Sequence, residues 1–225
     1  MREVVIASGV RTAIGDYAGS LKKLSAVKLG GIAGKAAVER AGLKSEDIDE
    51  VLLGLCQAAG NRPNPARQVQ GAVGIPWEAP AVTVNQLCAS SMRCMEMAAY
   101  SIMLGKTDIA LVAGTEHTSS APYYLLKARE GYRLFDANDG PWDALQRDGL
   151  IDPFINVHMA VTAENLAKQY DISREEQDEL ALLSHQRAYA AVHNGTFKSQ
   201  IVPVEIKTRN GPAMFDADEH PRGDI

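Results

Sequence analysis

Cysteine is scarce in this chain of 225 residues, which contains only Cys56, Cys88 and Cys94. An odd set of three cysteines is unlike the disulfide framework of a small secreted domain and suits a reducing compartment. No two of them have the C-x-x-C spacing of a structural zinc site, so we predict no bound metal. We therefore expect a cytoplasmic protein in which any cysteine chemistry depends on a free thiol.

Long apolar runs and basic clusters are missing as well. No apolar stretch approaches the roughly 18 residues that a membrane-spanning helix needs, and the opening apolar segment has no leader-like residues before it. The formal net charge of -5 argues against a surface for nucleic acid or anionic membrane. A chain that is 46% hydrophobic and 23% charged has the composition of an ordinary globular protein.

Strand and helix patterns alternate through the first half of the chain. We predict strands at residues 3–8, 51–55, 81–84 and 108–113, with helices at 27–40, at 66–73 and after Cys88. Gly42 lies just past the first helix, where a left-handed residue is expected. This alternation predicts βαβ units and a mostly parallel sheet, whose sites form beyond the carboxyl ends of the strands.

After Gly114 the pattern changes. Residues 115–157 have little periodicity and resemble a long functional loop. A helix is predicted from Met159 to Tyr170, and another begins after Ser173, which forms a capping-box pattern with Glu176. That helix should end near residues 194–195, and residues 201–206 form a predicted strand.

Cys88 occupies the position of greatest chemical interest, where the predicted strand at 81–84 gives way to a helix. We place it in the first turn of that helix, where free N–H groups and the helix dipole favour a thiolate. The small residues 89–91 that follow leave room for a substrate to approach the sulfur. A free cysteine is also commonly an inert core residue, and we expect this role for Cys94 and Cys56.

The sequence around Cys88, Asn-Gln-Leu-Cys-Ala-Ser-Ser-Met-Arg, resembles the nucleophilic cysteine segment of the thiolase family. Further similar segments occur in the family's order at residues 11–15, 64–68, 114–117, 148–150, 158–165, 173–178 and 216–219. The resemblance covers essentially the whole chain. It implies a layered α/β fold of the thiolase type, of which this chain is the N-terminal half.

The resemblance also implies a domain division and a set of binding residues. Residues 1–118 would be the N-terminal α/β domain, and residues 119–225 an inserted, α-rich loop domain that covers coenzyme A. His158 and Met159 would lie along the pantetheine arm, and Arg222 near the nucleotide end, where a guanidinium could pair or stack. From position alone, His158 would be a hydrogen-bonded structural histidine and Arg222 a solvated charge.

Thiolases transfer acyl groups through a thioester on their nucleophilic cysteine, with no cofactor besides the coenzyme A thioester substrate. They also use a Gly-His-Pro histidine, a Cys-x-Gly cysteine and an Asn-Glu-Ala asparagine, and this sequence contains none of these three motifs. Cys88 would therefore lack its base. The strand that completes the first half of the fold would also be missing, so we expect poor stability or self-association.

The resemblance thus implies an acyl-CoA C-acyltransferase of the acetyl-CoA acetyltransferase type. The expected partners are acyl-CoA, coenzyme A, and either further copies of the chain or a complementing C-terminal half. A coenzyme A-binding or scaffold subunit without activity, or an inactive fragment, is the main alternative. A decarboxylating ketoacyl synthase is disfavoured by the segments at 158–159 and 173–178.

Overall fold

The computed structural model describes residues 2–132 and 140–225. They form two compact units, and each is described by itself. The first contains the residues up to Ser120 together with Thr196–His220, and the second contains Ala121–Gly195 and Pro221–Ile225. Within the described residues, no helix is long and apolar enough to cross a membrane.

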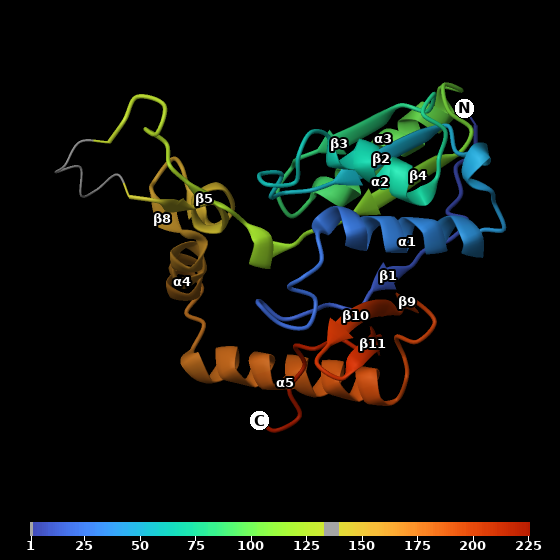
Figure 1. Ribbon diagram of the computed structural model, residues 1–225. Coiled ribbons are helices and arrows are strands. Elements are labelled where there is room, and N and C mark those ends of the chain that lie inside the picture. The colour runs from blue at the N-terminus through green and yellow to red at the C-terminus, as the bar shows by residue number, and fades with distance from the viewer. Residues whose placement is uncertain (1, 133–139) are drawn as a thin grey trace. The chain divides into compact units, whose positions relative to one another are not determined.

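A parallel three-stranded sheet forms the centre of the first unit (Figure 1). Strand β2 (Glu50–Gly54) lies between β3 (Ala81–Val84) and β4 (Ala110–Gly114). Both neighbours run parallel to β2, in a register that aligns Gly54 with Val84 and with Gly114. The three carboxyl ends therefore lie at the same edge of the sheet, as the βαβ pattern predicts.

Helices cover both faces of this sheet because Val51, Leu52 and Leu53 of its central strand are apolar and fully buried. Val51 and Leu53 pack against α1 (Ala26–Arg40) and α2 (Pro65–Val73), whereas Leu52 packs against α3 (Ser90–Met103). Because successive strand residues point to opposite faces, α3 lies on the other side of the sheet from α1 and α2. The predicted layered α/β arrangement is confirmed.

The predicted helix boundaries depend on side-chain caps that the structure contains. Ser25 accepts a hydrogen bond from the Lys28 amide at the start of α1, and Gly42 is left-handed just past its end. Asn64 caps α2 and also donates to the Ala81 carbonyl at 3.0 Å. The start of α2 is thereby tied to β3, the strand that leads to Cys88. A short 3-10 helix, Ser45–Asp47, lies between α1 and β2.

The strand predicted at residues 3–8 is wrong. This segment has no regular structure, and Val5 and Ile6 are 76% and 75% exposed. The first strand is instead β1 (Arg11–Thr12), which pairs in parallel with β9 (Ile201–Val202). A strand needs a neighbouring strand to satisfy its backbone N–H and C=O groups. Within the described residues β4 pairs with β2 alone, so residues 3–8 do not form a strand beside it.

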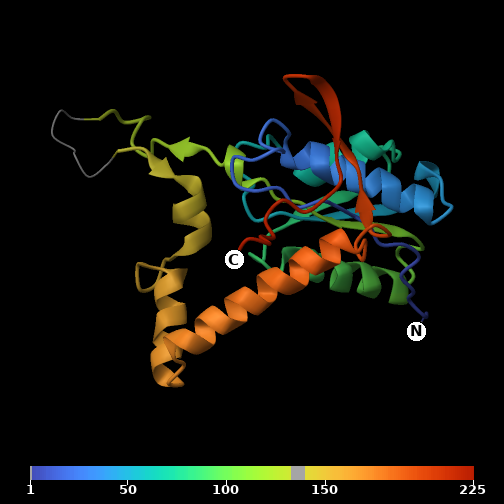
Figure 2. The same ribbon diagram turned by 90° about the horizontal axis from the view of Figure 1, so that it is seen from below.

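The strand predicted at residues 201–206 is interrupted at Pro203, which has no N–H to donate. After it, β10 (Val204–Thr208) forms an antiparallel hairpin with β11 (Gly211–Phe215), a strand that the sequence pattern did not predict. Val204, Ile206 and Phe215 pack with Leu21 and Leu29. The hairpin therefore covers the side of α1 that faces away from the sheet (Figure 2).

The second unit is dominated by two helices, α4 (Met159–Gln169) and α5 (Arg174–His193). The capping box predicted at Ser173 and Glu176 is confirmed, and α5 ends next to the predicted end at residues 194–195, with Gly195 left-handed beyond it. The predicted loop at 115–157 includes residues 133–139, which lie outside the described residues. Its other parts contain one-turn helices at Thr118–Ser120 and Gln146–Leu150 and short strands β5 (Tyr123–Tyr124), β6 (Trp142–Asp143), β7 (Ile151–Asp152) and β8 (Val157–His158).

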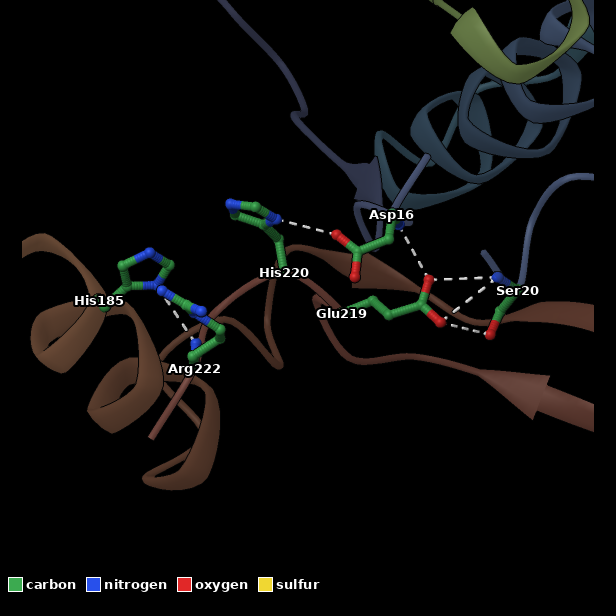
Figure 3. Close-up of polar contacts among 6 residues, drawn as sticks. All are labelled: Asp16, Ser20, His185, Glu219, His220 and Arg222. Atoms are coloured by element: carbon green, nitrogen blue, oxygen red, sulfur yellow. Dashed lines mark hydrogen bonds and ion pairs between the residues drawn. The ribbon is translucent and has the colours of Figure 1, made fainter. Parts of the chain in front are cut away.

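Three consecutive residues at the end of the first unit hold the loop at residues 11–20. Asp218 accepts two hydrogen bonds from the Arg11 guanidinium, at 2.7 and 2.8 Å, and one from the Ile14 amide. The Glu219 carboxylate accepts from the Asp16 amide and from Ser20, and His220 bonds the Asp16 carboxylate (Figure 3). The hydrogen bonds from Arg11 hold the pKa of Asp218 below its usual value.

Partial burial opposes ionisation of Glu219, but the hydrogen bonds from Ser20 and the Asp16 amide outweigh it and lower its pKa. Carboxyl groups with lowered pKa values contribute stability above the unfolded pKa of about 4, and this is lost as the pH falls through the folded pKa. We therefore predict a steep loss of stability below about pH 4.

The substitution Asp218→Asn should lower the free energy of unfolding at neutral pH by about 2 kcal/mol and flatten this acid decline. Urea unfolding across the acid range measures both effects. Asp216→Asn removes the same charge at an exposed neighbouring position and serves as the control. An acid decline that is equally steep in the Asp218→Asn and wild-type chains would contradict the prediction.

Candidate active site

Cys88 is an exposed free thiol in the turn that joins β3 to α3. The predicted position in the first helical turn is slightly wrong, because α3 begins at Ser90 and Ala89 is its N-cap. Cys88 precedes the cap, since the chain first forms a tight turn in which the Ala89 amide donates to the Gln86 carbonyl. The thiol is nevertheless within one turn of the helix N-terminus, which favours negative charge.

The residue before the thiol has an unusual backbone conformation. Leu87 has a φ of 51°, in the left-handed region that costs a non-glycine residue about 1 kcal/mol. The buried Ser90 hydroxyl donates to the Leu87 carbonyl at 2.5 Å and accepts from the Gln86 amide at 2.9 Å. Such a turn lifts the following side chain clear of the strand and exposes it.

Two glycines let the N-terminus of α3 approach the sheet. Gly54 and Gly114 are the last residues of β2 and β4, and they face each other in register. A Cβ on Gly54 would lie 2.4 Å from the Ser91 nitrogen, and one on Gly114 would lie 2.7 Å from the Ser91 Cβ. Only glycine fits at both positions without moving the helix, so these residues determine where the Cys88 turn lies.

The other two cysteines have different environments. Cys94 is fully buried against Leu52, as predicted for a core residue. Cys56 lies just beyond β2 and is only partly buried, so its predicted place in the core is wrong. Burial raises the pKa of the Cys56 thiol, and the charges of Glu116 and of the Cys88 sulfur raise it further. Cys88 is therefore the most accessible of the three thiols.

A hollow of about 350 Å³ lies beside the Cys88 turn. Gln86 and Ala89, from the turn itself, line it together with Met92, Arg93, Met95 and Glu96 of α3. Met92 and Met95 are exposed, whereas Cys94 and Ala98 form the face of α3 that packs on the sheet. The outer face of α3 thus carries two exposed methionines beside the ion pair of Arg93 and Glu96.

His158 and Met159 are adjacent in the second unit, where β8 meets α4. The Nδ1 atom of His158 accepts the Ala160 amide at 3.1 Å and caps the helix. In the neutral ring the proton is therefore on Nε2, which leaves a donor directed away from the helix. The Met159 side chain is 49% exposed. These positions combine a structural cap with groups that a ligand could reach.

Arg222 is exposed and lies against α5 rather than α4. Its amide donates to His185 Nδ1 at 3.3 Å (Figure 3). The following Gly223 is closely packed against Tyr189, since a Cβ there would lie 2.4 Å from the aromatic ring. The backbone at this position is held in place, and the residue is exposed.

Comparison with known families identifies the type of chain that contains this site. The profile of the family described as "Thiolase, N-terminal domain" matches residues 4–225. The chain belongs to the thiolase family. The match covers the α/β unit and the helical unit alike, and it extends through the Cys88 turn, His158, Met159 and Arg222.

Similar curated thiolases include the beta-ketothiolase BktB and an acetyl-CoA acetyltransferase of Cupriavidus necator, with identities of 47% and 44% over 99% of this chain. A solved acetyl-CoA acetyltransferase from Syntrophomonas wolfei superposes with a TM-score of 0.92 at 43% identity, over 98% of this chain and 55% of its own. The thiolase fold is therefore confirmed. The chain spans about half the length of the curated relatives, 56% in both Cupriavidus proteins.

The sequence interpretation gave no role to several residues that shape the Cys88 turn. Asn85 was included only as part of a family segment, and Glu116 likewise. The close approach at the ends of β2 and β4 could have been predicted from the sequence, because both strands end in glycine. The left-handed Leu87 carried none, since leucine gives no indication of that conformation.

We predict that Gly54→Ala lowers the free energy of unfolding by about 3 kcal/mol, because its Cβ would collide with the backbone of Ser91. Urea unfolding measures the change. Gly9→Ala is the matched control, since a Cβ at Gly9 meets no atom within 4 Å, and its effect should stay within about 0.5 kcal/mol. Equal stabilities of the two variants would show that the close approach of α3 to β2 is not required.

Proposed function

We propose that this chain is the nucleophile-bearing half of an acyl-CoA C-acyltransferase. The observation that carries the proposal is an exposed thiol at the β3–α3 junction of a chain whose family match extends through that turn. The Cys88 sulfur attacks the carbonyl carbon of an acyl-CoA. The new carbon–sulfur bond forms a thioester on Cys88, the bond to coenzyme A breaks, and coenzyme A leaves as the free thiol.

The transition state of this step carries negative charge on the carbonyl oxygen, which needs hydrogen-bond donors. The Cys88 amide is a suitable donor, because a backbone N–H at the nucleophile lies close to the oxygen that develops charge. The thiol proton also needs a base, which thiolases supply from a Gly-His-Pro histidine. This sequence has no such motif, so we infer that the base comes from a second polypeptide or from a further part of a longer chain.

Coenzyme A binding is proposed for the second region of the chain. We assign residues 1–118 to the N-terminal α/β domain and residues 119–225 to the loop domain that covers the coenzyme. His158 can donate from Nε2 because Nδ1 is occupied by the Ala160 amide. Met159 offers a flexible apolar surface to the pantetheine arm, and the Arg222 guanidinium can pair with the nucleotide end.

A complementing partner is supported by the apolar surfaces of the first unit. Met92 and Met95 are exposed on the outer face of α3, and Val5 and Ile6 are exposed in the N-terminal segment. Exposed apolar surface of this extent is typical of interaction sites. We propose that a C-terminal thiolase half covers it, or a second copy of the chain in its absence.

The acyl acceptor role is tested by intact-protein mass spectrometry after incubation with acetyl-CoA. We expect a single acetyl adduct that forms slowly and without turnover on the wild-type chain, because the base is missing, and none on Cys88→Ser, with Cys94→Ser as a control that keeps the adduct. No adduct on a chain that circular dichroism shows to be folded would overturn acyl transfer by this half alone. In that case a coenzyme A-binding or scaffold role would explain the chain better, because Cys88 without a base for its thiol proton would not transfer acyl groups.

A further inference from the structure

The side chain of Asn85 joins the nucleophile turn to the end of β2. Its Oδ1 atom accepts the Leu87 amide at 2.9 Å, and its Nδ2 atom donates to the Cys56 carbonyl at 3.1 Å. Asn85 is the first residue beyond β3, and Cys56 lies two residues beyond β2. A single amide group thus connects the loops that follow two neighbouring strands.

Glu116 lies two residues beyond β4 and binds the amide side of the Cys56–Gln57 segment, opposite the Cys56 carbonyl that Asn85 binds. Its carboxylate accepts the Cys56 amide at 2.9 Å and the Gln57 amide at 3.2 Å. Cys56 is therefore bonded through its N–H to Glu116 and through its carbonyl to Asn85. The result is a continuous hydrogen-bonded chain from the end of β4, through the end of β2, to the residue before Cys88.

This hydrogen-bonded connection stabilises the backbone conformation of Leu87, which side-chain packing does not stabilise. Leu87 is left-handed, and its side chain is 53% exposed, so few apolar contacts offset the strain. Leu87 is held by the hydrogen bond from its amide to Asn85 and by the Ser90 hydroxyl and amide, which both donate to the Leu87 carbonyl. The direction of the Cys88 side chain follows from that conformation.

We infer that Asn85 is a positioning residue for Cys88, and that Glu116 acts on Cys88 through the Cys56 peptide and Asn85. The inference rests on the proposed role of Cys88 as nucleophile. Without Asn85, Leu87 relaxes to a right-handed or extended conformation and the sulfur leaves the N-terminus of α3. The thiol then no longer projects from the turn as it does beside the left-handed Leu87, and an alkylating reagent reaches it more slowly.

The test is the rate at which iodoacetamide alkylates each cysteine of the full chain at neutral pH, resolved by peptide mass spectrometry. Alkylation requires no acyl transfer, so failure of the proposed function leaves this measurement intact. Cys94 is fully buried and reports any general loosening of the fold. We expect Asn85→Ala to slow alkylation of Cys88 about fivefold and to leave Cys94 protected, while Asn210→Ala, at an exposed hairpin turn, changes neither.

Two further variants separate positioning from a general effect on folding. Asn85→Ser retains an oxygen that can accept the Leu87 amide, so it should recover most of the Cys88 rate. Glu116→Gln removes the negative charge that the Cys56 amide contacts. We expect Cys56 to react faster, because the charge of Glu116 helps to raise its pKa, and Cys88 to react about twofold more slowly.

Several results would overturn the inference. They are an unchanged Cys88 rate in Asn85→Ala, no recovery in Asn85→Ser, and faster alkylation of Cys88 in Glu116→Gln. If Asn85→Ala exposes Cys94, that variant has loosened the fold, and Glu116→Gln becomes the test. In Glu116→Gln, Cys94 must stay protected while alkylation of Cys56 becomes faster and alkylation of Cys88 becomes slower.

Discussion

The contact between the ends of two parallel strands and the N-terminus of α3 controls the geometry of the site. Gly54 and Gly114 lie opposite each other, and a Cβ on either would fall within 2.7 Å of Ser91. The helix can therefore approach the sheet closely enough for the turn before it to bond both Asn85 and Ser90. Close packing of backbone against backbone is rigid, and this rigidity lets a strained leucine precede an exposed thiol.

Around this contact, part of the apolar surface of the first unit is left exposed. The inner face of α3 is buried on the sheet through Cys94 and Ala98, while Met92 and Met95 remain exposed on its outer face. The N-terminal segment, apolar like a strand, lies unpaired within the described residues. These features agree with a sequence that spans about half the length of its relatives, and with the proposal that Cys88 is a nucleophile whose base lies outside this sequence.

Periodicity and capping residues predicted most of the first unit because its elements are specified locally. In this unit, strand 81–84 and the left-handed Gly42 follow from short patterns, as does the capping box at Ser173 in the second unit. The strand at 3–8 could not be judged in this way, since a strand exists only where a second strand pairs with it. The position of Cys88 was predicted to within one turn, but the left-handed Leu87 and the bonds of Asn85 depend on tertiary contacts between three strand ends.

We propose that Cys88 needs a base that this sequence does not contain. The most direct measurement is thiolysis of acetoacetyl-CoA by the chain alone and after mixing with the C-terminal half of the Cupriavidus necator acetyl-CoA acetyltransferase. We predict turnover only when both halves are present, and its loss in Cys88→Ser. Turnover by the chain alone at a rate equal to that of the mixture would contradict the account.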